Sequence, residues 1–368
     1  MRIHKWLRGG LPTLCLMSLV SAASNSTQTT PATSTTSTTA TTATSSTDIT
    51  SAFYSSPKRG LIFIPNANFP DDNAVWVQNG SDLTWYYNYK AYPSTEYAED
   101  TAFQFVPMLW GAPSSFNDTT FIDNVTAQIV HGSNITHVMG FNEPDGTSAT
   151  GGSDIAPSDA ALYWIKQMEP LRKLGVLLGA PAVTGALSGF QWLANFTDAC
   201  DGGCTFDFIP IHWYGNLLGL QNHLADVAAA YPGVDQWITE FALDDAALNT
   251  TQEFFQDAVR FLDENDNVTN YSYFGSFRSF TSNVGINVAM LDSWGNLTDI
   301  GSWYLGGNAT GIIPTNTSVT PAVVVPTGGT ATYTLPPLAT KVSAGPRQWA
   351  AGREAGLAAL VAVVFLLL

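Results

Sequence analysis

The 368-residue chain is poor in cysteine, histidine and basic residues. It has three cysteines, five histidines, and 14 lysines and arginines against 30 aspartates and glutamates, for a formal net charge of −16. A surface with this much negative charge repels polyanions. We therefore expect no nucleic-acid partner and favour a neutral ligand. The sequence also lacks the several close-spaced Cys or His pairs of a zinc module. We therefore expect neither a metal ion nor a cofactor.

The chain also lacks an apolar run of the roughly 20 residues that a membrane span requires. Its first apolar run, Leu11–Val20, follows three basic residues and precedes Ser21-Ala22-Ala23. Basic, apolar and small residues in this order are typical of a secretory signal, so we expect residues 1–23 to be a signal peptide. A membrane anchor helix is the alternative.

A second short apolar run, Ala355–Leu368, follows the small residues Ser343-Ala344-Gly345 and a polar spacer. This order predicts a glycosylphosphatidylinositol (GPI) anchor signal over residues 344–368, which is removed from the mature protein. The alternative is a short tail-anchor helix. Together the two ends predict a secreted protein at the cell surface or cell wall, attached to the membrane through a lipid anchor only.

Two biased segments flank the part of the chain that can form a core. Residues 24–52 are mainly Ser, Thr and Ala, which predicts a disordered, O-glycosylated linker, and residues 311–343 form a second linker rich in Thr, Pro and Val. We expect residues 53–310 to be the single folded domain. N-glycosylation sequons, which support a secretory route, begin at positions that include Asn79, Asn117, Asn124, Asn195, Asn249 and Asn296.

Cysteine usage agrees with secretion. Cys15 lies in the expected signal peptide, which leaves Cys200 and Cys204 in the segment Cys-Asp-Gly-Gly-Cys. A lone pair in a secreted chain predicts a disulfide. A zinc site is the competing interpretation, but no further close-spaced Cys or His pair would complete it.

Short apolar runs recur through residues 53–310, with helical patterns between them. Eight are predicted as strands: Arg59–Pro65, Thr84–Tyr89, Phe103–Trp110, His137–Glu143, Leu177–Val183, Phe206–Tyr214, Gln236–Phe241 and Ser272–Ser279. Several are apolar on both faces, as parallel strands covered by helices are. Eight such strands alternating with helices predict an α/β fold, the (β/α)₈ TIM barrel. An open doubly wound sheet is the alternative, although no Gly-rich phosphate loop follows the first strand.

Two of the intervening helices are clear in the sequence. The spacing of apolar residues predicts one helix over Ser158–Leu174, ending at Gly175, and another over Thr251–Leu262 with Thr251 as a plausible cap.

Two of the predicted strands end in a glutamate that no core requires. Glu143 ends His137–Glu143 and is followed by Pro144, and Glu240 lies near the end of Gln236–Phe241. Barrel enzymes build their active sites at the carboxyl ends of the strands, so both carboxylates are expected on one face. A pair of carboxyl groups is what glycoside hydrolysis needs. The alternative is that each is a solvated loop glutamate.

The sequence motifs around these glutamates resemble those of a known family. Gly140–Asp145 and Trp237–Phe241 look like the two catalytic strand ends of glycoside hydrolase family 128, a fungal β-1,3-glucanase family, and the likeness extends to Lys58–Leu61, Trp85–Asn88 and His212–Tyr214. The resemblance implies a retaining endo-β-1,3-glucanase that acts on cell-wall β-1,3-glucan or its oligosaccharides through a covalent glycosyl-enzyme intermediate.

The resemblance also implies catalytic roles. Glu143 would be the acid/base and Glu240 the nucleophile, with the carboxyl groups about 5–5.5 Å apart. Burial and the second carboxylate should keep the acid protonated, whereas hydrogen-bond donors should keep the nucleophile ionised. Tyr214 is a candidate donor to Glu240, His212 an orienting hydrogen-bond group, and Asn142 a partner for a sugar hydroxyl.

Other expected substrate-binding residues are mostly aromatic, because aromatic rings with polar edges suit the faces of sugars, although such rings also fill barrel cores. This set comprises Trp85, Asn88, Trp110, Trp213 and Phe277.

Two other functions remain open. A surface-anchored protein that binds β-glucan without cutting it would keep an aromatic groove but would not need two glutamates at strand ends. A β-glucan transglycosylase would use the same intermediate with a sugar acceptor in place of water. For each function we expect a monomer.

Overall fold

The computed structural model describes residues 56–98, 100 and 102–321. The expected signal peptide, the Ser/Thr-rich linker and the anchor signal lie outside these residues, as does most of the C-terminal linker. Within the described part of the chain, none of the helices is both long and apolar enough to cross a membrane.

The strands form one parallel sheet in the order β3-β2-β1-β8-β7-β6-β5-β4. They are β1 (Arg59–Ile62), β2 (Trp85–Tyr87), β3 (Gln104–Phe105), β4 (His137–Met139), β5 (Leu177–Gly179), β6 (Phe208–Tyr214), β7 (Asp235–Ala242) and β8 (Val268–Tyr273). Just after β3, a parallel bridge pairs Met108 with Met139 of β4, and the Leu109 amide donates to the Met139 carbonyl over 3.0 Å. This bridge joins the two edges of the sheet, so the predicted (β/α)₈ barrel is confirmed.

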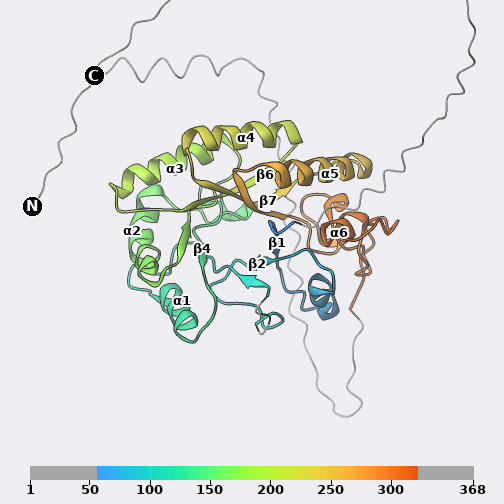
Figure 1. Cartoon of the computed structure of the whole chain (residues 1–368), viewed down its shortest axis with the longest axis horizontal. Helices are drawn as coiled ribbons and strands as arrows, with labels where there is room; N and C mark the ends of the chain where they lie inside the picture. The colour runs from blue at the N-terminus through green and yellow to red at the C-terminus, as the bar shows by residue number, and fades with distance from the viewer. Residues whose placement is uncertain (1–55, 99, 101, 322–368) are drawn as a thin grey trace, which may run out of the picture. The chain divides into compact units, whose positions relative to one another are not determined.

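Helices follow one another around the outside of the strands from α1 to α6 (Figure 1). They are α1 (Thr120–Val130), α2 (Pro157–Gln167), α3 (Leu187–Cys200), α4 (Leu217–Ala230), α5 (Leu248–Glu264) and α6 (Asp299–Tyr304). Short 3₁₀ helices supplement them: η1 (Pro70–Val77), η2 (Ser148–Thr150), η3 (Glu169–Leu174), η4 (Ser279–Thr281) and η5 (Ile286–Val288). Among the described residues, the connections from β1 to β2 and from β2 to β3 contain no α-helix, so this side of the barrel departs from the regular pattern.

Several strands end earlier than expected, and three other expected boundaries were wrong for an identifiable reason. The eighth strand is Val268–Tyr273 rather than Ser272–Ser279, because polar Thr269 and Asn270 hid its beginning and the aromatic run after Tyr273 leaves the sheet as a buried loop. The helix expected over residues 158–174 stops being α-helical at Gln167, because Pro170 has no amide hydrogen to continue the ladder. Helix α5 begins at Leu248, so Thr251 is not its cap; its hydroxyl donates to the Ala247 carbonyl.

Side chains pointing into the barrel form their own apolar cluster. It comprises Ile62, Trp85, Tyr87, Val106, Met108, Met139, Ala182, Phe208 and Trp237. The centroids of the Trp85 and Trp237 rings lie 5.0 Å apart. In the sheet, Trp85 of β2 is paired with Gly60 of β1. A Cβ on Gly60 would lie 2.1 Å from the Trp85 ring, so only glycine fits there. The larger cluster packs the other strand faces against the helices.

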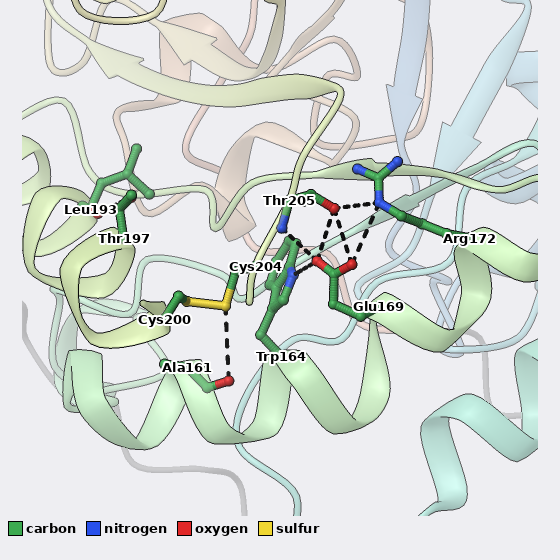
Figure 2. Close-up of a disulfide and its surroundings, with 9 residues drawn as sticks. All are labelled: Ala161, Trp164, Glu169, Arg172, Leu193, Thr197, Cys200, Cys204 and Thr205. Carbon is green, nitrogen blue, oxygen red and sulfur yellow. Dashed lines mark hydrogen bonds and ion pairs between the residues drawn. A yellow bond between two sulfur atoms is a disulfide. The ribbon is translucent and has the colours of Figure 1, made fainter. Parts of the chain in front are cut away.

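The predicted disulfide is confirmed between Cys200, the last residue of α3, and Cys204, whose Cα atoms are 5.5 Å apart (Figure 2). The next residue, Thr205, donates from its hydroxyl to Glu169, and the Trp164 indole donates to the same carboxylate over 2.9 Å. The disulfide therefore closes a turn whose exit is held against η3, away from the carboxyl ends of the strands.

Candidate active site

The two glutamates reach the same end of the barrel by different backbone routes. Glu240 belongs to β7, where the register with β6 shifts so that Ile211 faces Ile238 but His212 faces Glu240. Such a bulge re-aims side chains. Glu143 lies beyond β4 with a φ of 39°, in the left-handed region that costs about 1 kcal/mol or more for a residue with a Cβ. Its amide donates to the Ala182 carbonyl over 2.7 Å, which holds this conformation.

The structure brings Glu143, Glu240 and His212 together, and all three are buried. One carboxylate oxygen from each glutamate and one ring nitrogen of His212 lie within 4.8 Å of one another. His212 Nδ1 is 3.1 Å from Glu143 Oε1 and 3.4 Å from Glu240 Oε2. The imidazole therefore lies between the carboxylates, as an orienting group should. By distance alone these atoms could also hold a cation.

Two tyrosines hold Glu240. The Tyr214 hydroxyl donates to Oε2 over 2.6 Å, as the sequence predicted, and the Tyr89 hydroxyl donates to Oε1 over 2.8 Å. Sequence reasoning missed Tyr89. It has a φ of 60° and lies in a bend just after β2. Because Tyr89 ends the predicted strand Thr84–Tyr89, the strand-end argument that selected the glutamates could have found it.

The protonation pattern differs from the expectation in one respect. Burial raises the pKa of Glu240; the nearby His212, Tyr214 and Tyr89 lower it and Glu143 raises it, leaving it above its ordinary value. Donors are therefore present but do not keep the pKa of Glu240 low. Burial lowers the pKa of His212, but Glu240 and Glu143 outweigh burial and leave that pKa raised. Glu240 and His212 thus each bind a proton more tightly than they would in water.

A cavity of about 270 Å³ opens onto this cluster. Its lining residues come from strands β6 and β7 and from the loops after five other strands: Ile64, Tyr89, Trp110, Asn142, Glu143, Thr150, Gly151, Tyr214, Glu240, Phe274, Asn283 and Val284. Trp110 is 40% exposed, as a residue that contacts a ligand must be. Asn142 donates from Nδ2 to the Gly151 carbonyl over 3.1 Å, while its buried Oδ1 has no partner among the described residues. That oxygen can accept a hydrogen bond from a hydroxyl group.

Four expected substrate-binding residues do not line this cavity. Trp85 is 2% exposed inside the barrel, so the expectation that it contacts a sugar was wrong. Asn88 is buried and donates to the Tyr92 carbonyl and the Ser94 hydroxyl, which fixes the loop after β2. The Trp213 ring packs against His223 of α4, with centroids 5.2 Å apart, and its indole donates to the Asn216 carbonyl. Phe277 lines a second cavity instead.

Comparison with known proteins connects this geometry to a family. The profile described as "Glycosyl hydrolase catalytic core" matches residues 60–304. Alkali-sensitive linkage protein 1 of Schizosaccharomyces pombe is 33% identical over 260 residues, which cover 68% of this chain and 44% of the relative. The chain thus spans less than half the length of that curated relative.

Two solved structures of glycoside hydrolase family 128 are similar to the chain over most of their own length. One is a subgroup III curdlan-specific exo-β-1,3-glucanase from Blastomyces gilchristii in complex with glucose, with 26% identity, a TM-score of 0.54, and 68% of this chain and 98% of that chain covered. The other is a subgroup VII oligosaccharide-binding protein from Cryptococcus neoformans, with 25% identity, a TM-score of 0.54, and 69% and 94% covered.

Proposed function

Because the chain belongs to the glycosyl hydrolase catalytic core family, and within it to glycoside hydrolase family 128, we propose that it hydrolyses β-1,3-glucan with retention of configuration. The observation that carries this proposal is the cluster of Glu143, His212 and Glu240. One carboxylate oxygen of each glutamate and one ring nitrogen of His212 lie within 4.8 Å of one another. Retaining glycosidases hold their carboxyl groups about 5–5.5 Å apart, whereas inverting ones need roughly 6.5–9.5 Å to admit a water. The observed approach supports direct attack by a carboxylate.

In the first step Glu240 attacks the anomeric carbon while Glu143 protonates the departing glycosidic oxygen. Ionising two carboxyl groups this close together is unfavourable, because their negative charges repel each other. Tyr89 and Tyr214 donate to different oxygens of Glu240, which favours the ionised form that the attack requires. His212, between them, balances the remaining negative charge.

In the second step Glu143, now ionised, takes a proton from water, and that water displaces Glu240 from the anomeric carbon. Two inversions at the same carbon give net retention. A sugar hydroxyl in place of the water would give transglycosylation by the same residues.

Binding without cleavage is the second candidate, because a solved structure at 25% identity is described as an oligosaccharide-binding protein. The raised pKa of Glu240 also favours this candidate in part, since a protonated nucleophile cannot attack. The buried carboxylate pair with its dedicated donors favours hydrolysis, because a binding groove does not require it.

Product analysis of the purified protein on linear and branched β-1,3-glucans tests the proposal. We expect oligosaccharides whose newly formed reducing ends are β when first released, as followed by NMR before mutarotation. Products with α ends would indicate inversion. Binding of laminari-oligosaccharides with no products at any pH between 4 and 8 would support the binding candidate.

The place of action is part of the same proposal. The signal-like residues 1–23 and the anchor-like residues 344–368 support a secreted, GPI-anchored protein of the cell surface. Mass spectrometry of the mature protein should find no peptide from residues 357–368. Detection of such peptides would replace the lipid anchor with a membrane helix.

A further inference from the structure

A second cavity, of about 190 Å³, lies beside the active-site cavity. Ile64, which follows β1 and is 48% exposed, lines both cavities, so the two share a wall. The second cavity is bounded by the segment around η1, including Asn66 and Trp76, and by the segment after β8, including Phe277. Phe277 was expected to bind substrate, and it lies here rather than beside the glutamates.

A row of aromatic rings runs from the nucleophile to this second cavity. Tyr214, which donates to Glu240, packs edge-to-face on Phe274 with ring centroids 5.6 Å apart. Phe274 in turn packs on Phe277, with centroids 5.5 Å apart. Aromatic faces pack well against the apolar faces of sugar rings. A chain of glucosyl units can therefore follow this row from one cavity to the next.

Asp72, which lines the second cavity, is held by hydrogen bonds, and its charge is balanced. Asp72 accepts two hydrogen bonds from the Arg278 guanidinium, over 2.6 and 2.7 Å, and a third from Asn66 Nδ2 over 3.0 Å. Both members of the ion pair are buried, and the guanidinium carbon lies 3.6 Å from the centre of the Phe69 ring. A paired aspartate and arginine leave no net charge, which suits a neutral ligand.

The two glutamates give the cleft a direction. In a retaining glycosidase the acid faces the leaving group, and the nucleophile faces the anomeric carbon of the sugar that becomes attached to the enzyme. Glu143 lies on the side of Trp110, whose carbonyl accepts from the Asn142 amide over 2.9 Å. The aromatic row begins on the side of Glu240 and leads away through Phe274 to Phe277.

We propose that the second cavity binds a glucosyl unit on the non-reducing side of the cleaved bond, with Phe277 as its ring platform, and that Trp110 contacts the leaving-group side. This inference rests on the proposed hydrolysis of β-1,3-glucan. It assigns the two exits of the active site.

Aryl β-glycosides test the assignment, because the aryl group occupies the leaving-group side and any added glucosyl unit must extend the donor side. We expect kcat/KM to rise about tenfold or more from the aryl β-glucoside to the aryl β-laminaribioside and laminaritrioside. Phe277→Ala should lower the ratio of kcat/KM for the aryl laminaritrioside to that for the aryl glucoside about tenfold. Trp110→Ala should slow cleavage of laminaripentaose without lowering that ratio.

Phe116→Ala is the matched control, since Phe116 is 51% exposed and lines neither cavity; it should change neither quantity. Phe277→Leu keeps an apolar side chain without the ring and serves if Phe277→Ala lowers the melting temperature. A ratio unchanged by both Phe277 variants would overturn the inference while hydrolysis stands. If the wild type cleaves no substrate, the proposed function fails, and calorimetry then tests whether the second cavity binds sugar. Unchanged affinity of Phe277→Ala for laminaritriose would overturn binding in this cavity, and a loss of affinity would support it.

Discussion

Glu240 and Glu143 differ in how firmly the fold holds them. Glu240 projects from the eight-residue strand β7, which pairs with a strand on each side, and both of its oxygens accept hydrogen bonds from tyrosines. Glu143 lies in a loop, in a left-handed conformation, and His212 is the partner shown for its carboxylate among the described side chains. A nucleophile must be held within a fraction of an ångström, whereas an acid/base must exchange its proton twice in each turnover. The contrast supports the proposed roles.

The largest expected effect comes from Glu240→Ala. This change removes the atom that would form the covalent intermediate, so kcat on β-1,3-glucan should fall by about 10⁴-fold or more. Azide, a small nucleophile that fits the space left by the carboxylate, should restore some turnover. The glycosyl azide should have inverted configuration, which NMR can determine. A retained azide product from this variant would reverse the roles of the two glutamates.

Glu143→Ala should be less severe, with a loss of about 10²–10⁴-fold on β-1,3-glucan. The nucleophile is still present, so aryl glycosides with good leaving groups should react rapidly in a first turnover and then stall. Azide should release the intermediate as a product of retained configuration. Pre-steady-state measurement of the burst tests this; a Glu143→Ala variant with full activity on β-1,3-glucan would place the acid elsewhere.

Tyr89 and Tyr214 each donate a hydrogen bond to one oxygen of Glu240. Tyr89→Phe and Tyr214→Phe should each lower kcat by about 10–100-fold, since each removes a hydrogen bond to a carboxylate that must be ionised. Both hydrogen bonds lower the pKa of Glu240. Their removal should therefore move the acidic limb of the pH–rate profile to higher pH. Tyr92→Phe, at an exposed ring, is the control and should leave the profile in place.

The smallest effect concerns stability. The folded-state pKa of Glu240 is raised above 4.5 and that of His212 above 6.5, so the folded protein binds both protons more tightly than the unfolded chain does. Each contribution is fully present below the ordinary pKa and is lost as the pH rises through the raised one. The melting temperature should therefore fall as the pH rises from about 5 to 8.

Glu240→Gln tests which group is responsible for this stability effect. Glutamine does not titrate, so this variant should show a flatter dependence of melting temperature on pH than the wild type. Equal slopes would show that the Glu240 proton does not contribute to it.

Sequence patterns determined the architecture of the protein and its central residues. Seven of the eight strands begin within two residues of the expected start, although β1 to β5 are shorter than expected, because apolar runs between helical patterns depend on local composition. Glu143 and Glu240 were found because a carboxylate at the end of a buried strand has no role in a core. The Cys200–Cys204 disulfide could be predicted because these are the only two cysteines outside the expected signal peptide.

Only the tertiary structure decided which way the aromatic rings point. Trp85 and Trp110 both belong to predicted strands, yet one fills the barrel and the other lines the cavity. A strand presents alternate residues to opposite faces, so a local bulge or an early strand end changes the destination of every ring beyond it. Tyr89 is brought to Glu240 from 151 positions away, and the pKa of Glu240 depends on burial that no single segment provides. Closure of the barrel sets both, because it determines which distant side chains share a space from which water is largely excluded.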